Sequence, residues 1–190
     1  MQFDGNYIRR GTVDVSKIAE AVGGLSEDDW LEDDYRQKTF VSHRETNTVP
    51  LLFDIDFRSS DPTRCRHYER FAPVIDPVHV ALAASFGDNG WVIRSLFARL
   101  PPGGTILRHK DRGFSLTNSH RVHIAVVTNA GAGFSVGDEE RHMRCGEMWE
   151  INNQRGHTAW NRGPYGRIHL IVDWVPGSGV RRVSDAGQKS

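Results

Sequence analysis

The sequence predicts a mainly β fold of the jelly-roll (cupin-like) type, with a few N-terminal helices packed on it. Three observations lead to this prediction. About eight short segments between Trp91 and Val175 have the apolar content of strands, turn-forming residues separate most of them, and the helical signals lie in the first 90 residues. Eight short strands within about 85 residues are typical of a sandwich or barrel, and a jelly roll suits that number.

Each predicted strand is a short apolar or alternating run bounded by glycine, proline or asparagine. The strands are expected near residues 91–100, 105–110, 121–128, 133–137, 141–145, 147–151, 157–160 and 167–175. The turns between them include Pro101–Gly104, Asn129–Gly133, Gly137–Asp138 and Asn161–Gly166. An earlier, half-buried strand is expected where Phe53, Ile55 and Phe57 alternate with two aspartates.

Three helical segments are expected before the strands of the core. Asp14 can cap a helix over residues 15–22. Ser26–Asp29 matches a capping box, in which the first and fourth side chains bond each other's backbone N–H. Asp76 followed by Pro77 is typical of a helix start, and that helix is expected to end near Gly87.

One domain of 190 residues is expected from the length. Within it, residues 1–90 form a mixed α/β part, residues 91–175 the jelly-roll core, and residues 176–190 a loose polar tail.

Composition excludes several classes of protein. Lysine plus arginine (24) balances aspartate plus glutamate (24), so no overall field draws the chain to nucleic acid or to a membrane surface. Cys65 and Cys145 lack metal or redox spacing, which favours two reduced thiols in a cytoplasm. No signal peptide and no apolar run of roughly 18 residues is visible. We expect a soluble, cytoplasmic protein, whose oligomeric state the sequence leaves open.

A candidate metal site begins at His109-Lys110-Asp111, at the end of a predicted strand. Successive side chains of a strand alternate faces, so His109 and Asp111 point the same way. Together they supply two ligands of a 2-His-1-carboxylate site, which binds Fe(II) and leaves positions open. His157, which opens a later strand, is the best candidate for the third ligand. Other histidines could serve instead, and they are His43, His67, His79, His120, His123, His142 and His169.

Arg167 opens the last predicted strand, ten positions after His157. The turn between them can bring Arg167 back beside His157 inside the barrel. A buried arginine needs an anionic partner, and the distal carboxylate of 2-oxoglutarate would supply one. From periodicity alone, a surface arginine at a strand start is slightly favoured.

Arg121 and His123 share one face of a strand that is otherwise apolar. This pattern indicates a polar lining for an anion, such as the 1-carboxylate end of the same cosubstrate. A pair of solvent-facing side chains on an antiparallel strand is the alternative.

Taken in order, five segments resemble the aspartyl/asparaginyl β-hydroxylase family, and in particular its small bacterial members similar to cis-4-proline hydroxylase. The segments are His109–Gly113, Arg121–Asn129, Gly146–Asn152, His157–Asn161 and Arg167–Asp173. The resemblance covers about residues 93–174, which makes the jelly-roll core over residues 91–175 the catalytic core. The first 90 residues match weakly, and substrate choice is expected to reside partly there. It implies a double-stranded β-helix, Fe(II) on His109, Asp111 and His157, and 2-oxoglutarate salt-bridged to Arg167. Arg121 and His123 would lie near the other carboxylate of the cosubstrate.

The resemblance also implies the reaction. With O2 as second cosubstrate, such an enzyme hydroxylates a C–H bond and releases succinate and CO2. The implied substrate is an amino acid, free or bound to a carrier or peptide, with aspartate, asparagine and proline as first candidates. Arg112 and Arg162 could bind a substrate carboxylate or be solvated.

Two other functions remain open from the residues. One is a metal-dependent cupin isomerase or dioxygenase that does not use 2-oxoglutarate and could take His123 as an extra ligand. The other is a non-catalytic metal-binding cupin. Neither of them needs Arg167.

Overall fold

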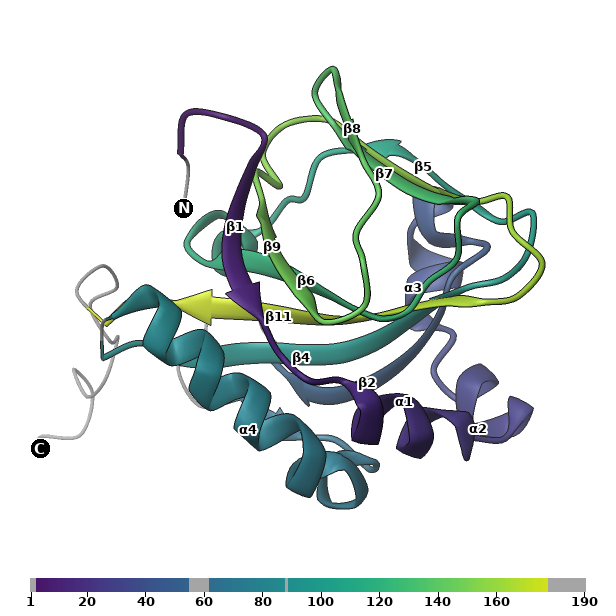
Figure 1. Ribbon diagram of the computed structural model, residues 1–190, viewed down its shortest axis with the longest axis horizontal. Helices are drawn as coiled ribbons and strands as arrows, with labels where there is room; N and C mark the ends of the chain where they lie inside the picture. The colour runs from purple at the N-terminus through teal and green to yellow at the C-terminus, as the bar shows by residue number, and fades with distance from the viewer. Residues whose placement is uncertain (1–2, 55–61, 88, 178–190) are drawn as a thin grey trace, which may run out of the picture.

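A computed structural model describes residues 3–54, 62–87 and 89–177 of the chain. Figure 1 shows a large sheet that lies between a smaller sheet on one side and helices on the other. The large sheet has the strand order β1-β9-β6-β11-β4-β2-β3, and the small sheet has the order β5-β10-β7-β8. The named strand pairs are antiparallel. The prediction of a mainly β, jelly-roll fold with a few helices is confirmed.

In both sheets, most neighbouring strands come from distant segments of the chain. In the large sheet they are β1 (Tyr7–Thr12), β2 (Asn47–Phe53), β3 (Thr63–Arg64), β4 (Trp91–Leu100), β6 (His120–Val127), β9 (Glu147–Ile151) and β11 (Arg167–Val175). In the small sheet they are β5 (Thr105–His109), β7 (Ala132–Val136), β8 (Glu139–Arg141) and β10 (His157–Asn161). Three strands of the large sheet therefore come from the first 90 residues, while the predicted division into parts stays a prediction.

The described helices are short except for one. They are α1 (Ser16–Gly23), α2 (Glu27–Leu31), α3 (Tyr35–Thr39), α4 (Tyr68–Phe86), α5 (Phe114–Thr117) and the 3-10 helix η1 (Val41–His43). Helices α1 and α4 cover the outer face of the large sheet (Figure 1). Because α4 buries Phe71, Ile75, Val78 and Leu82 at helical spacing, it packs one apolar stripe on the sheet.

Among the described residues, this layering gives two larger apolar cores and a small third cluster of Leu96, Ala98 and Ile171. The larger one lies between the helices and the large sheet and includes Ile18, Phe71 and Phe97. The second lies between the two sheets and includes Phe134 and Ala159. The inner faces of both sheets thus enclose the space in which the polar residues described below are buried.

The predicted start of the long helix is wrong. Helix α4 begins at Tyr68, so Asp76 and Pro77 lie inside it. An internal proline costs a helix roughly 3 kcal/mol. Burial of a large apolar side chain stabilises by about 1.5–3 kcal/mol, and both Phe71 and Ile75 are fully buried N-terminal to Pro77. Tertiary packing therefore extends the helix past the local signal, while its end at Gly87 (φ 66°) agrees with the prediction.

Other local predictions have mixed outcomes. The capping box at Ser26 and Asp29 is confirmed. The first helix instead begins at Ser16 without a side-chain cap, although Asp14 accepts a 2.9 Å hydrogen bond from the Ser16 N–H. The strand expected over residues 141–145 is wrong, because β8 ends at Arg141.

The described residues include only part of the predicted early strand and of the predicted tail. Strand β2 ends at Phe53, while Ile55 and Phe57 lie outside the described residues, as does most of the predicted tail. Strand β1 had no clear signal in the sequence, and it pairs with β9 at the edge of the large sheet.

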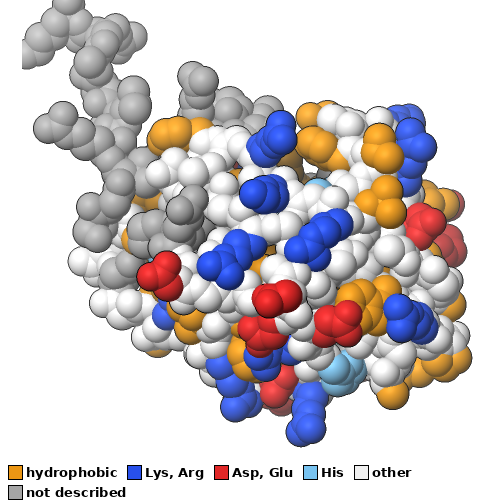
Figure 2. Space-filling model, turned by 90° about the horizontal axis from the view of Figure 1, so that it is seen from above, with side chains coloured by type: hydrophobic (Ala, Val, Ile, Leu, Met, Phe, Trp, Pro, Cys, Tyr) orange, Lys and Arg blue, Asp and Glu red, His pale blue; other side chains and the backbone are white. Residues whose placement is uncertain are grey.

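Charges of both signs lie close together on the face seen in Figure 2. Among the described helices, none is both long and apolar enough to cross a bilayer.

Candidate active site

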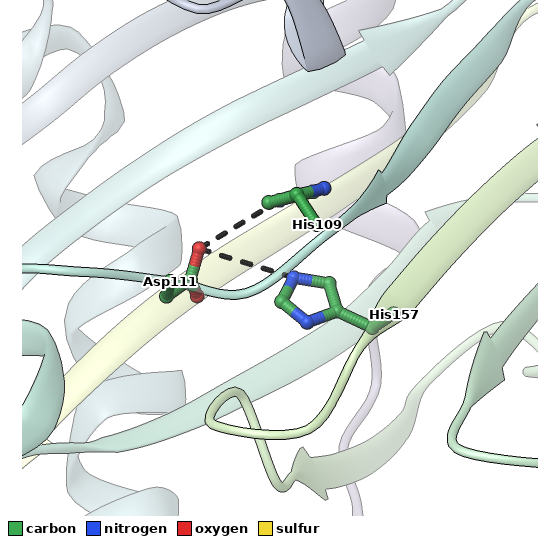
Figure 3. A group of neighbouring side chains, drawn as sticks. All are labelled: His109, Asp111 and His157. Carbon is green, nitrogen blue, oxygen red and sulfur yellow. Dashed lines mark ion pairs between the residues drawn. The ribbon is translucent and has the colours of Figure 1, made fainter.

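The side chains of the three predicted metal ligands point toward one another (Figure 3), and their ligand atoms all lie within 4.8 Å of one another. His109 ends β5 and His157 opens β10, and the two residues are cross-strand partners whose ring centroids are 4.3 Å apart. Asp111 lies two residues after the end of β5. Its Oδ1 lies 3.7 Å from Nε2 of His109 and 3.8 Å from Nε2 of His157. In the described part of the chain this is the one His/Cys/Asp/Glu group with metal-site spacing.

Backbone contacts orient both histidine rings. Nδ1 of His109 lies 2.7 Å from the carbonyl oxygen of Leu107, and Nδ1 of His157 lies 3.0 Å from that of Arg155. A carbonyl only accepts, so each Nδ1 carries the proton and each Nε2 presents a lone pair toward Asp111. Burial lowers the pKa of His157 to about 4. The ring is therefore neutral at physiological pH, which is the state that binds a metal.

Asp111 is held in a buried ion-pair network. Its Oδ2 accepts a 2.6 Å hydrogen bond from Nη1 of Arg121, and its backbone N–H donates to the carbonyl of Asn153. Nε and Nη2 of Arg121 donate to the two carboxylate oxygens of Asp173, each at 2.8 Å. Burial alone lowers the pKa of Arg121, but attraction by both carboxylates outweighs it and raises that pKa. Oδ1 of Asp111 is thereby left facing the histidines.

Sequence reasoning missed Asp173 and its second partner, Arg94. Across three neighbouring strands, Asp173 is in register with Arg121 of β6 and with Arg94 of β4. Nη1 of Arg94 lies 3.7 Å from Oδ2 of Asp173. The sequence offered one indication, since Asp173 shares the alternating face of β11 with Arg167. Only the pairing of β11 with β6 and β4 shows, however, that Asp173 lies beside Arg121 and Arg94.

An inner pocket extends from the two histidines between the sheets. Arg167, His123 and Phe134 line it together with His109 and His157. The Phe134 ring stacks against His157, with centroids 6.1 Å apart, and lies 5.8 Å from the guanidinium of Arg167. The predicted juxtaposition of Arg167 with His157 inside the fold is therefore present.

Arg167 is a buried cation with no carboxylate partner among the described residues. It is 3% exposed, and its Nη2 lies 2.9 Å from Nδ1 of His169. Burial lowers its pKa to about 9, so it still carries its charge at neutral pH. An uncompensated buried charge is costly, which makes Arg167 suited to an anionic ligand.

Arg121 and His123 have different surroundings. Both are buried, which excludes the solvent-facing alternative. The donors of Arg121 reach Asp111 and Asp173, and these contacts favour a role in orienting Asp111 over a role at the cosubstrate. Burial first, and then the charges of Arg167 and Arg121, hold the pKa of His123 well below its ordinary value.

An outer pocket of about 420 Å³ opens beside the three candidate ligands. Such a volume is ordinary for a small-molecule site. Tyr35, Phe40, Phe53 and Leu116 give it apolar walls. The two pockets share His43, His109 and Arg121, so the candidate metal site lies where they meet.

The two arginines considered for a substrate carboxylate lie apart. Arg112 is exposed and lines the outer pocket. Arg162 is also exposed, lines neither the inner nor the outer pocket, and lies over the ring of Trp160.

One family model matches more than half of this chain. Its description is aspartyl/asparaginyl beta-hydroxylase, and it matches residues 62–176. None of the curated proteins matches the sequence.

Similar solved structures belong to related classes of enzyme. An oxidoreductase of the 2OG-Fe(II) oxygenase family from Burkholderia pseudomallei has a TM-score of 0.55 and 15% identity, over 72% of this chain and 69% of that one. A collagen prolyl hydroxylase of Paramecium Bursaria Chlorella virus-1 has a TM-score of 0.54 and 9% identity, over 90% of this chain and 96% of that one. A prolyl-4-hydroxylase of Pseudomonas putida has a TM-score of 0.53 and 12% identity, over 91% of this chain and 94% of that one. At these identities the likeness shows the fold alone.

Proposed function

This chain belongs to the aspartyl/asparaginyl β-hydroxylase family and is an Fe(II)/2-oxoglutarate-dependent oxygenase, and we propose that it hydroxylates a C–H bond of an amino acid. The amino acid is free or part of a peptide or carrier-bound molecule, and aspartate, asparagine and proline are the first candidates. The proposed site combines His109, Asp111 and His157 with Arg167.

The proposed metal is Fe(II), held by His109, Asp111 and His157. The donor set supports it, because two neutral imidazoles and one carboxylate form the facial triad of non-heme Fe(II) oxygenases. Adjacent ligand atoms of an octahedral ion lie roughly 3 Å apart. The observed separations of 3.7 and 3.8 Å need only small side-chain shifts to reach that value. With 2-oxoglutarate and O2, the bound metal supplies the oxidising chemistry that converts C–H to C–OH.

The observation that carries the proposal is the buried charge of Arg167 in the pocket that the two histidines also line. The distal carboxylate of 2-oxoglutarate would compensate that charge through a bidentate contact. A cupin that does not use 2-oxoglutarate, or one that only stores metal, has no use for a cation there. The inner pocket offers about 20 Å³, roughly the space of one water. Entry of the cosubstrate therefore requires its walls to shift.

The remaining residues would position the metal ligand Asp111 and shield the pockets from water. Arg121, tied to Asp173, compensates the charge of Asp111 and holds its Oδ2, so that Oδ1 faces the two histidines. Phe134 closes the inner pocket between His157 and Arg167. The outer pocket beside the triad has room for the amino-acid substrate, and its apolar walls would exclude water from the reacting carbon.

Turnover of 2-oxoglutarate tests the proposal. Free amino acids and short peptides are screened for stimulation of 2-oxoglutarate decarboxylation by the Fe(II)-loaded protein under O2, with succinate and the hydroxylated product measured together. We expect at least one amino-acid substrate to give succinate and product in equal amounts. Stimulation by nucleobases, lipids or sugars alone would contradict the substrate class. Absence of 2-oxoglutarate binding would contradict the cosubstrate and favour the two alternative cupin functions.

A further inference from the structure

We infer that His169 is a positioning residue, whose Nδ1 accepts a hydrogen bond from Nη2 of Arg167 and fixes the guanidinium for the distal carboxylate of 2-oxoglutarate. The inference rests on the proposed function and adds to it a residue that does not itself touch metal or cosubstrate.

The placement of the two side chains supports this role. Arg167 and His169 are two residues apart on β11, so they share the face that looks between the sheets. Their side-chain nitrogens are 2.9 Å apart, and both residues are buried. Arg167 lines the inner pocket, whereas His169 is not among its lining residues. His169 therefore contacts Arg167 from outside the lining of that pocket.

The direction of the hydrogen bond follows from the chemistry of the groups. A guanidinium has donors and no acceptor, so Nδ1 of His169 must present its lone pair. Nδ1 of His123 lies 3.4 Å from the same atom, and it can only donate there. His169 must then be neutral. Burial, reinforced by the charge of Arg167, holds its pKa well below the ordinary value, in agreement with this requirement.

A held guanidinium binds better than a mobile one. A free arginine side chain has many rotamers, and ordering it on binding weakens the affinity for the ligand. With His169 in place, much of this ordering precedes binding. Loss of a hydrogen bond to a charged group is expected to weaken 2-oxoglutarate binding roughly ten- to hundredfold.

The test compares two ligands on matched variants. Calorimetry measures binding of 2-oxoglutarate and of 2-oxopentanoate to the Fe(II)-loaded, oxygen-free protein. The second ligand has the same chain and keto acid but no distal carboxylate. The variants are His169→Leu, which removes the acceptor, and His169→Asn, whose amide oxygen can take the place of Nδ1. His142→Leu is the control, because His142 is exposed and its Nδ1 lies against the carbonyl of Ala132.

We expect His169→Leu to weaken 2-oxoglutarate binding roughly ten- to hundredfold. Binding of 2-oxopentanoate and of Fe(II) should be nearly unchanged. His169→Asn should recover most of the loss, and His142→Leu should bind like the parent protein. Equal weakening of both ligands, or none, would overturn the inference while leaving the proposed function standing. If the parent protein does not bind 2-oxoglutarate, both fail together. Unfolding curves of each variant show whether a weak binder is simply misfolded, and in that case His169→Asn decides.

Discussion

Nη1 of Arg121 donates a 2.6 Å hydrogen bond to Oδ2 of Asp111, the carboxylate that faces both histidines of the candidate metal site. The same guanidinium holds both oxygens of Asp173. The buried Arg121 cation thus compensates two carboxylates, one from a proposed metal ligand and one from a residue of the last strand. Because all three side chains are buried, the network matters for stability as well as for the site.

Replacing Arg121 should destabilise the protein strongly. Arg121→Met leaves two buried carboxylates without this cation, and removal of one partner from a buried pair typically costs about 3–5 kcal/mol. Urea unfolding of the metal-free protein measures the change. Arg162→Met is the control at an exposed arginine, where we expect a change within about 0.5 kcal/mol. Similar small changes for both variants would show that the network contributes little.

Removing His157 should remove the metal site. His157→Ala deletes one of three proposed ligands, so we expect loss of Fe(II)-dependent turnover and a large fall in Fe(II) affinity. The fold should be largely kept, because β10 retains its backbone pairing with β5 and β7. Metal titration and circular dichroism check these outcomes. Near-normal affinity and turnover would falsify the assignment and point to His123 or His169.

Truncating Arg167 should separate an oxygenase from a generic metal cupin. Arg167→Ala removes the proposed partner of the distal carboxylate, at a cost of about 3–5 kcal/mol. The corresponding loss of 2-oxoglutarate affinity is roughly a hundred- to several-thousandfold. Arg167→Lys should rescue only part of it, since an ammonium lacks the two-pronged geometry. Anaerobic titration of the Fe(II)-loaded variants provides the measurement, and unchanged affinity would shift the role to another residue.

Acid should destabilise the metal-free protein through its buried histidines. Burial lowers the pKa of His79 to about 4, from about 6.5 when unfolded. Between these values the unfolded chain binds more protons than the folded one. The free energy of unfolding is therefore unaffected by His79 above about pH 6.5 and falls as the pH decreases toward 4. For this residue alone the loss is about 3 kcal/mol. His123, His157 and His169 act in the same direction.

Urea unfolding of metal-free protein at several pH values tests this. His79→Gln, which can keep a hydrogen bond to the Ser95 hydroxyl, should show a shallower decline between pH 6.5 and 4. An identical pH dependence in parent and variant would contradict the contribution of His79.

Most strands of the core could be predicted from the sequence because each depends on local alternation and on the turn residues around it. The predicted start of helix α4 was wrong because it relied on such a local signal alone. Pro77 is a local signal, and it was outweighed by burial of Phe71 and Ile75 against a sheet that the local sequence does not reveal. Strand β1 was missed because Tyr7–Thr12, with two adjacent arginines and a glycine, has no clear apolar alternation, and only its pairing with β9 shows it to be a strand.

The sequence by itself determined that His109 and Asp111 point the same way, because side chains two apart in extended chain share a face. It also supplied Arg167, and it favoured His157 as the third ligand while leaving the other histidines as alternatives. The tertiary structure decided the rest: His157 lies opposite His109, Arg121 turns to Asp111 and Asp173, and His169 contacts Arg167. The pairings of His157 with His109 and of Arg121 with Asp173 depend on strand register between distant segments. The alternation within one strand says which face is buried, but it does not say which distant strand lies beside it or which residues are opposite each other.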